Sequence, residues 1–255
     1  MGGGLDSLLA AFRAIGLEEL DERAALLRRV DVKYVVDGDA FAELCEQLRG
    51  DHEVLELDGR RTFHYETVYF DTPQLRCYRD HEEGRLPRFK ARTRLYRDSE
   101  RCVFEVKMKV GEDETDKRQI DHPPDERAAL TDRAARFLGE TLREKQIDPP
   151  GKLEPSLHTE FRRTTLAAAA RPDRLTCDVD LELRRGELRG RLEPGLIVLE
   201  TKSENGESLA DAALADLGIE PIALSKYRAG IELLADESAS GDSREAVRYF
   251  RSSRI

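Results

Sequence analysis

The stretch that decides the fold is basic and alternating, with six cations and no acid: Arg85-Leu-Pro-Arg88-Phe-Lys90-Ala-Arg92-Thr-Arg94-Leu-Tyr96-Arg97. From Arg88 to Arg94 a cation falls on every second residue. Because successive side chains of a β-strand point to opposite faces, these cations would form a row along one face. Phe89, Ala91, Thr93 and Leu95 would face the other way. Like charges on one face repel one another, so the natural partner of this row is a polyanion.

The rest of the chain is acidic. Its 255 residues carry a net charge of -10, and the sequence pI is about 5.2. General affinity for nucleic acid or membrane surfaces would call for a basic protein, so a basic row within an acidic chain favours a local site. The chain has no Trp for base stacking, which further disfavours nucleic acid as a partner.

Cysteine spacing and hydropathy favour a cytoplasmic protein. The four cysteines, at positions 45, 77, 102 and 177, have no CxxC spacing and indicate reduced thiols. The Met1-Gly-Gly-Gly start has neither the basic nor the apolar run of a targeting segment. No run approaches the ~18 apolar residues of a membrane span. We therefore expect no direct membrane insertion.

Periodicity and turn residues predict a mixed chain of strands and helices. Strands are expected at 30–36, 64–70, 88–97, 101–110, 117–120, 157–166, 174–184 and 196–202. Helices are expected at 6–15, 21–28, 40–48, 208–217 and 225–234, with a helical insertion at about 123–146. Residues 1–235 would form one domain, and residues 236–255 a polar, flexible tail.

Charge alternation recurs on other predicted strands. Glu105, Lys107 and Lys109 share one parity, and Asp178, Asp180 and Glu182 share another. One interpretation is an ordinary sheet with its charged face in solvent. The other is a closed barrel with a charged, water-filled interior and helices packed outside. In the barrel, water or a bound anion would have to compensate the cations, because burying bare charge is costly.

The order of short motifs resembles the VTC domain, the polyphosphate polymerase branch of the triphosphate tunnel metalloenzymes. The likeness covers about residues 25–235 and is carried by these segments in order: Arg29-Val-Asp31-Val-Lys33-Tyr34, Tyr69-Phe70-Asp71-Thr72, Tyr78-Arg-Asp-His81-Glu-Glu-Gly84, Lys90-Ala-Arg92-Thr-Arg94-Leu-Tyr96, Phe104-Glu105-Val-Lys107, Lys117-Arg118, Phe161-Arg-Arg163, Asp178-Val-Asp180, Leu199-Glu200-Thr-Lys202 and Ser225-Lys226-Tyr227. Each segment alone is weak, but their shared order is specific.

The resemblance implies an α+β fold: an eight-stranded antiparallel β-barrel, or triphosphate tunnel, with helices packed outside. It implies a phosphate-binding set of Lys33, Lys90, Arg92, Arg94, Lys107, Lys117, Arg118, Arg163, Lys202 and Lys226. Within the site, the residues expected to be catalytic are Arg92, Arg94, Lys107, Arg163 and Glu200. Glu200 would be the main ligand of Mn²⁺ or Mg²⁺, with Asp31, Glu105, Asp178 and Asp180 as further metal candidates.

Two positions depart from the family pattern. The related CYTH triphosphatases open with ExExK, but Arg29 stands at the first Glu position, which disfavours the triphosphatase branch. Eukaryotic polymerases carry a second Lys shortly before the Ser-Lys-Tyr motif, where this chain has Ala223.

The expected activity is transfer of the γ-phosphoryl group of ATP onto a polyphosphate chain. The expected partners are a nucleoside triphosphate and inorganic polyphosphate or triphosphate. A membrane-protein partner stays open. Two alternatives stay open at this point. One is a metal-dependent triphosphatase or polyphosphatase, and the other is a module that binds polyphosphate without turnover.

Overall fold

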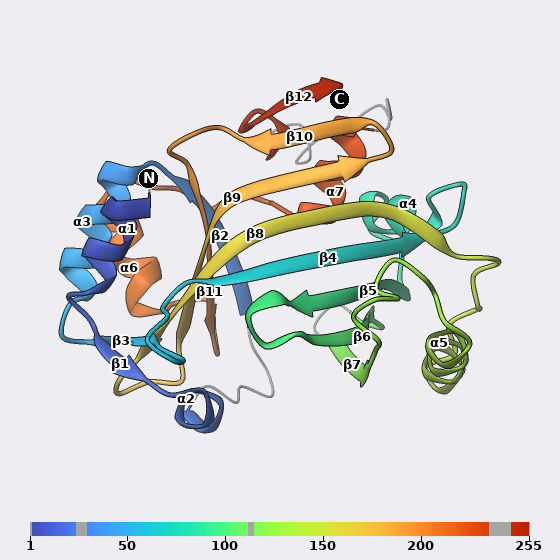
Figure 1. Cartoon of the computed structure of the whole chain (residues 1–255), viewed down its shortest axis with the longest axis horizontal. Coiled ribbons are helices and arrows are strands. Elements are labelled where there is room, and N and C mark those ends of the chain that lie inside the picture. The colour runs from blue at the N-terminus through green and yellow to red at the C-terminus, as the bar shows by residue number, and fades with distance from the viewer. Residues whose placement is uncertain (1, 24–29, 112–114, 235–245, 255) are drawn as a thin grey trace. The chain divides into compact units, whose positions relative to one another are not determined.

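The structure is a computed structural model that describes residues 2–23, 30–111, 115–234 and 246–254. The chain divides into two compact units (Figure 1). Unit 1 comprises Met1–Phe63, Phe161–Leu181 and Leu192–Leu224, and unit 2 comprises His64–Glu160, Glu182–Arg191 and Ser225–Ile255. The predicted domain of residues 1–235 contains segments of both units. The flexible tail expected at residues 236–255 stays a prediction, and its residues 236–245 lie outside the described residues.

Helices and strands both occur throughout the chain. The helices are α1 (Gly2–Leu9), α2 (Leu17–Arg23), α3 (Gly38–Leu48), α4 (Arg76–Glu82), α5 (Asp132–Glu144), α6 (Leu209–Asp216) and α7 (Lys226–Leu234). The strands are β1 (Arg13–Ile15), β2 (Val30–Val36), β3 (His52–Leu55), β4 (Phe63–Asp71), β5 (Arg88–Tyr96), β6 (Arg101–Lys109), β7 (Thr115–Asp121), β8 (Glu154–Ala168), β9 (Arg174–Arg185), β10 (Leu188–Leu192), β11 (Ile197–Ser203) and β12 (Phe250–Arg254). In the described part of the chain, no helix has the length and apolarity needed to cross a membrane.

The predicted α+β class, built on an antiparallel sheet, is confirmed. The sheet has twelve strands rather than eight, in the order β12-β10-β9-β8-β4-β5-β6-β7. Strand β11 joins β2 to β9, and β3 joins β1 to β8. Hydrogen bonds between described residues do not close this sheet into a continuous ring. The predicted helix 6–15 is corrected, because α1 ends at Leu9 and Arg13–Ile15 pairs in parallel with β3.

Unit 1 includes three antiparallel strands that pack against helices. Strand β11 pairs with β2 on one side and with β9 on the other. Apolar side chains of these strands pack against α1, α3 and α6, which lie together in Figure 1. Asp37 caps α3 and Ser208 caps α6, so each helix begins at the polar residue that satisfies its first N–H groups.

Unit 2 contains the antiparallel ladder β4-β5-β6-β7. One face of this ladder is apolar, with Phe89, Phe104 and Met108 packed against Leu138 and Leu142 of α5. Helix α5 occupies only part of the predicted insertion 123–146. It begins after Thr131, whose side chain accepts from Ala134 N and caps the helix.

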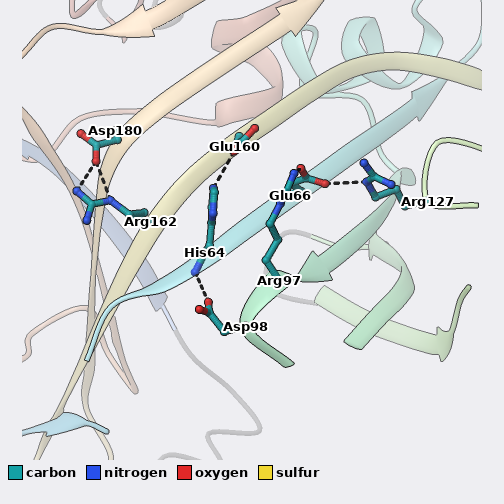
Figure 2. A network of polar contacts seen from close by, with 8 residues as sticks. All are labelled: His64, Glu66, Arg97, Asp98, Arg127, Glu160, Arg162 and Asp180. Atoms are coloured by element: carbon teal, nitrogen blue, oxygen red, sulfur yellow. Dashed lines mark hydrogen bonds and ion pairs between the residues drawn. The ribbon is translucent and has the colours of Figure 1, made fainter. Parts of the chain in front are cut away.

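A network of ion pairs covers the start of β4 in unit 2 (Figure 2). Glu66, which is only 8% exposed, accepts hydrogen bonds from Arg97 and from Arg127 Nε, the latter at 2.7 Å. Nearby, His64 Nε2 lies 2.8 Å from Glu160 Oε1 of β8. Burial disfavours ionisation of Glu66, but the two arginines outweigh it and lower the pKa of this carboxyl group.

The first prediction concerns the acid stability of this network. A carboxylate with a lowered folded-state pKa stabilises the protein above its unfolded pKa of about 4.3, and the stabilisation is lost as pH falls through the folded value. In Glu66→Gln, the melting temperature measured by circular dichroism should therefore fall less steeply with decreasing pH than in the wild type. Glu144→Gln, at a side chain that is 61% exposed and pairs with Arg118, is the control and should keep the wild-type slope. Equal slopes for wild type and Glu66→Gln would contradict the prediction.

Candidate functional site

The predicted cationic row lies on one face of β5 in unit 2. The residues between the cations are buried, with exposed fractions of 3% for Phe89, 1% for Ala91 and 1% for Thr93. The cations of β5 are half-buried. The predicted alternation of this strand is confirmed, and its apolar side faces the core under α5.

Strand pairing extends the row sideways across the sheet. Lys90 is the register partner of Lys107 on β6, and Lys107 is the partner of Lys117 on β7. On the other side of β5, Arg92 pairs with Tyr69 of β4. Direct cross-strand partners share a sheet face. The structure therefore brings five predicted phosphate ligands of unit 2 onto one face: Lys90, Arg92, Arg94, Lys107 and Lys117.

Glu105 is the acid at the centre of this face. Its side chain is 1% exposed and accepts from Arg92 Nε at 2.6 Å and from Lys117 Nζ at 3.1 Å. Arg94 NH1 lies 4.0 Å from the same carboxylate. Burial opposes ionisation, but the positive charges around Glu105 dominate and hold its pKa well below the usual range. Glu105, predicted as a metal candidate, is thus the counter-ion that holds Arg92 in place.

Arg118 lies on the opposite face of the ladder. Its register partner is Val106, which packs in the apolar cluster under α5. Its guanidinium bonds to Asp116 and, at 2.5 Å, to Glu144 of α5. We therefore leave Arg118 out of the candidate site.

The first turn of α7 contributes polar groups to the cationic face. Lys90 Nζ donates to Ser225 Oγ at 3.3 Å. Tyr69 is 6% exposed, and Arg92 lies over its ring at 5.9 Å. Burial would raise the pKa of Tyr69, but Arg92, Arg94 and Lys226 outweigh it and lower that pKa. A lowered tyrosine pKa in a buried site indicates a strongly positive local potential.

His81 on α4 reports the same positive potential. Burial is the largest cause that lowers the pKa of its imidazole, to about 2, and the next causes are Lys90 and Arg228. Arg88 and Lys107 lower it further. The imidazole is therefore neutral at physiological pH, able to accept a hydrogen bond at one nitrogen and donate at the other.

A pair of buried donors on this face lacks partners. Thr67 of β4 is 2% exposed and is the register partner of Arg94. Among the described residues, neither Thr67 Oγ1 nor Arg94 Nε has a hydrogen-bond partner. Arg94 instead lies over the Tyr65 ring at 5.8 Å. Buried donors without acceptors are costly, so a ligand rich in acceptor oxygens would be stabilised here.

Unit 1 holds the predicted metal carboxylate on β11. Glu200 forms an ion pair with Lys202 on the same strand, and its register partner on β2 is Lys33. Lys202 in turn is the register partner of Asp31. The side chains of Glu200 and Lys202 are 17% and 13% exposed. The structure thus brings together Lys33, Glu200, Lys202 and Asp31 on two paired strands.

Two neighbouring arginines of β8 differ in their surroundings. Arg163 forms a two-point contact with Asp178 of β9, at 2.6 and 2.8 Å, and Asp178 is 1% exposed. Arg162 pairs with Asp180, whose side chain is 46% exposed (Figure 2). Asp180 has a φ of 54°, in the left-handed region, which interrupts the regular alternation of β9. Asp178 and Asp180, predicted to align, therefore lie in different environments.

The described residues contain no ready-made cluster of three or more His, Cys, Asp or Glu side chains for a metal. The donor chemistry around Glu200 still fits a hard cation, because its carboxylate oxygens suit Mg²⁺ or Mn²⁺. Such ions are commonly bound by one or two carboxylates together with substrate phosphates. Asp31 is the other carboxylate on these paired strands.

A comparison with protein families matches the VTC domain over residues 28–235. The chain belongs to the VTC domain family. The match covers all the predicted site residues, from Asp31 to Lys226. No curated protein matches this sequence.

Two solved structures are similar to this VTC domain. A protein from Bacillus halodurans proposed to be an adenylate cyclase has a TM-score of 0.50 and 15% identity, over 78% of this chain and 94% of that chain. A Hippeastrum protein, proposed to be an adenylyl cyclase and described as having a dominant triphosphatase activity, has a TM-score of 0.48 and 16% identity, over 81% and 96% of the two chains.

Some residues in and near the candidate site were missed from the sequence or given only a structural role. Thr67 lies two residues from both Tyr65 and Tyr69, so alternation along β4 places it on the same face as these tyrosines. Ser156 and Asp71 form a buried network with Tyr227, with Ser156 Oγ 3.2 Å from the Tyr227 hydroxyl. No local pattern identifies Ser156, because its partners are distant in sequence.

The second prediction concerns Glu105 as the counter-ion of Arg92 and Lys117. Glu105→Gln leaves the charges of Arg92 and Lys117 without their shared carboxylate. Breaking a buried pair costs about 3 kcal/mol or more, reduced to about 2 kcal/mol here because Lys117 is 43% exposed. Urea unfolding should show this loss of stability. Arg118→Gln, on the opposite face, should cause a much smaller loss, because its ion pairs are exposed to solvent. Equal losses in the two variants would refute the role of Glu105.

Proposed function

We propose that this VTC domain is a metal-dependent phosphotransferase that moves the γ-phosphoryl group of a nucleoside triphosphate onto a polyphosphate chain. The observation that carries the proposal is the cationic face of β5, β6 and β7, where the buried acid Glu105 lies among cations that include Lys90, Arg92, Arg94, Lys107 and Lys117. A linear polyanion is the ligand that compensates an extended row of like charges. Membership of the VTC family supports polyphosphate as that ligand.

In this proposal, the cationic face of β5, β6 and β7 binds phosphates. Arg92, held by Glu105, presents a planar guanidinium suited to paired hydrogen bonds with phosphate oxygens. Lys90, Lys107 and Lys226 act as point charges along the chain. Neutral His81 accepts or donates a hydrogen bond without adding to the charge.

The proposed metal carboxylate is Glu200 of β11, on a strand that also carries Lys202. Glu200 would hold Mg²⁺ or Mn²⁺ with the help of phosphate oxygens, and the ion would neutralise charge on the transferred group. Arg163, fixed by Asp178, and Lys33 would bind phosphate oxygens. Phosphoryl transfer depends mainly on positioning and charge stabilisation, so no protein nucleophile is required. The terminal oxygen of the polyphosphate would attack the γ-phosphorus while the nucleoside diphosphate leaves.

Hydrolysis of triphosphate is the second candidate, with water in place of the chain end. Incubation with ATP and Mn²⁺, followed by electrophoresis of the products, distinguishes these outcomes. Polyphosphate chains support the proposal, free phosphate alone supports hydrolysis, and binding without turnover supports a binding module.

The third prediction uses the adjacent arginines of β8. Arg163→Gln should lower the rate of ATP turnover by about 100-fold, the typical effect of removing one preorganised donor. Arg162→Gln is the matched control, because its side chain pairs with exposed Asp180, and it should turn over at close to the wild-type rate. If both variants fall equally, the distinct role of Arg163 is rejected.

The fourth prediction concerns the unpartnered hydroxyl of Thr67. A phosphate oxygen that reaches this site would accept from Thr67 and Arg94 together, so Thr67→Val should weaken tripolyphosphate binding by about fivefold. Removing an unpartnered hydroxyl should not reduce the stability of the ligand-free protein. Thr93→Val is the control, since Thr93 Oγ1 donates to Arg127 O at 2.6 Å. This variant should lose stability and keep its affinity, and the reverse pattern in calorimetry would contradict the prediction.

A further inference from the structure

Two Lys-Tyr pairs of this chain share one structural device. Lys33-Tyr34 lies in β2 of unit 1, and Lys226-Tyr227 begins α7 of unit 2. In both pairs the tyrosine is buried and its hydroxyl donates to a buried aspartate. In both pairs, that aspartate also accepts from backbone N–H groups close to the start of a helix.

The device in unit 1 ties β2 to α6. The Tyr34 hydroxyl donates to Asp211 Oδ1 at 2.8 Å, and Thr201 Oγ1 donates to the same oxygen at 2.6 Å. Asp211 Oδ2 accepts from Ser208 N at 2.8 Å in the capping box of α6. Burial is the main cause that raises the pKa of Tyr34, and Asp211 adds to it, so the hydroxyl stays protonated as a donor. Because side chains alternate along β2, Tyr34 fixes the helix side of the strand while Lys33 points to the other face.

The device in unit 2 ties α7 to the end of β4. The Tyr227 hydroxyl donates to Asp71 Oδ2 at 2.5 Å, and Asp71 is 0% exposed. Asp71 also accepts from the N–H groups of Cys77 and Tyr78, at 2.8 and 3.0 Å, in the first turn of α4. The Tyr227 ring stacks on Tyr69 with centroids 4.9 Å apart, and burial followed by Asp71 raises the pKa of Tyr227.

We propose that Tyr34 and Tyr227 are positioning residues, which fix the backbone from which Lys33 and Lys226 reach the phosphate chain. The inference rests on the proposed function, since it assigns both lysines to phosphate. A lysine has a long, flexible side chain, so its affinity for an anion depends on where its Cα is fixed. The neighbouring contacts agree with this role: Lys33 O accepts from Ile222 N at 2.8 Å, and Ser225, before Lys226, accepts from Lys90. The buried Tyr–Asp bond holds each lysine's backbone without touching the ligand.

The test is a set of double-mutant cycles on the full chain, with tripolyphosphate affinity measured by calorimetry. Tyr34→Phe and Tyr227→Phe keep the ring and remove only the hydroxyl. Each should weaken binding by about threefold to tenfold, the range expected for one hydrogen bond. In the Lys33→Gln background, Tyr34→Phe should have less than about a twofold effect, and Tyr227→Phe should behave likewise with Lys226→Gln.

The crossed pairs serve as matched controls. The changes in binding free energy caused by Tyr34→Phe and Lys226→Gln should be additive, because each tyrosine acts on its own lysine. The same should hold for Tyr227→Phe and Lys33→Gln. A purely structural role would give additive effects in every pair and would overturn the inference. If a phenylalanine variant fails to fold, Thr201→Val loosens the Tyr34 contact at Asp211 and Ser156→Ala loosens Tyr227. Each replaces the corresponding tyrosine variant in its cycle, and additivity again refutes the role.

The same measurements separate this inference from the proposed function. If the wild-type protein does not bind tripolyphosphate, both the proposed function and this inference are rejected. Weaker binding in both lysine variants, together with wild-type affinity in both tyrosine variants, would overturn only the positioning role.

Discussion

Repulsion among cations on one sheet face is the constraint on which the rest of unit 2 depends. Lys90, Lys107 and Lys117 are successive cross-strand partners. Two such charges roughly 5 Å apart would repel by about 3 kcal/mol at an effective dielectric of about 20. Lysine side chains are flexible, so their ammonium groups can move apart and reduce part of this repulsion. In the proposed function, the remaining repulsion favours binding of a polyanion, because a bound phosphate chain would remove it.

The protein tolerates this face because the other face of the same strands is strongly apolar. Phe104, Val106 and Met108 are fully buried beneath α5, and their burial stabilises strands whose opposite side is electrostatically unfavourable. Glu105 lies between them in sequence and is the buried acid of the charged face. A single strand, β6, therefore carries both the hydrophobic stabilisation and the counter-ion.

Alternation along single strands made much of this structure predictable. Strands β2, β5 and β6 were placed closely, because a charge on every second residue has one simple explanation in β-structure. Strand β3 and helix α4 were missed, since their short sequences lack a clear period. The ion pairs Arg92–Glu105 and Arg163–Asp178 follow from strand pairing, which the sequence of one strand does not contain. The different surroundings of Asp178 and Asp180 arise from a backbone conformation at Asp180 that no motif indicates.

The way the arginines are held favours catalysis over simple storage of a polyanion. Non-specific binding of a flexible chain needs positive charge, which mobile lysines supply. Here Arg92 is fixed by Glu105, and Arg163 is fixed by a two-point contact with Asp178. Each buried carboxylate reduces the local positive charge around its arginine, which weakens binding of an anion. What it provides in return is a guanidinium of defined orientation, whose remaining donors need not reorganise when charge develops on a transferred phosphoryl group. Catalysis requires fixed geometry even where this weakens binding, whereas storage requires only affinity.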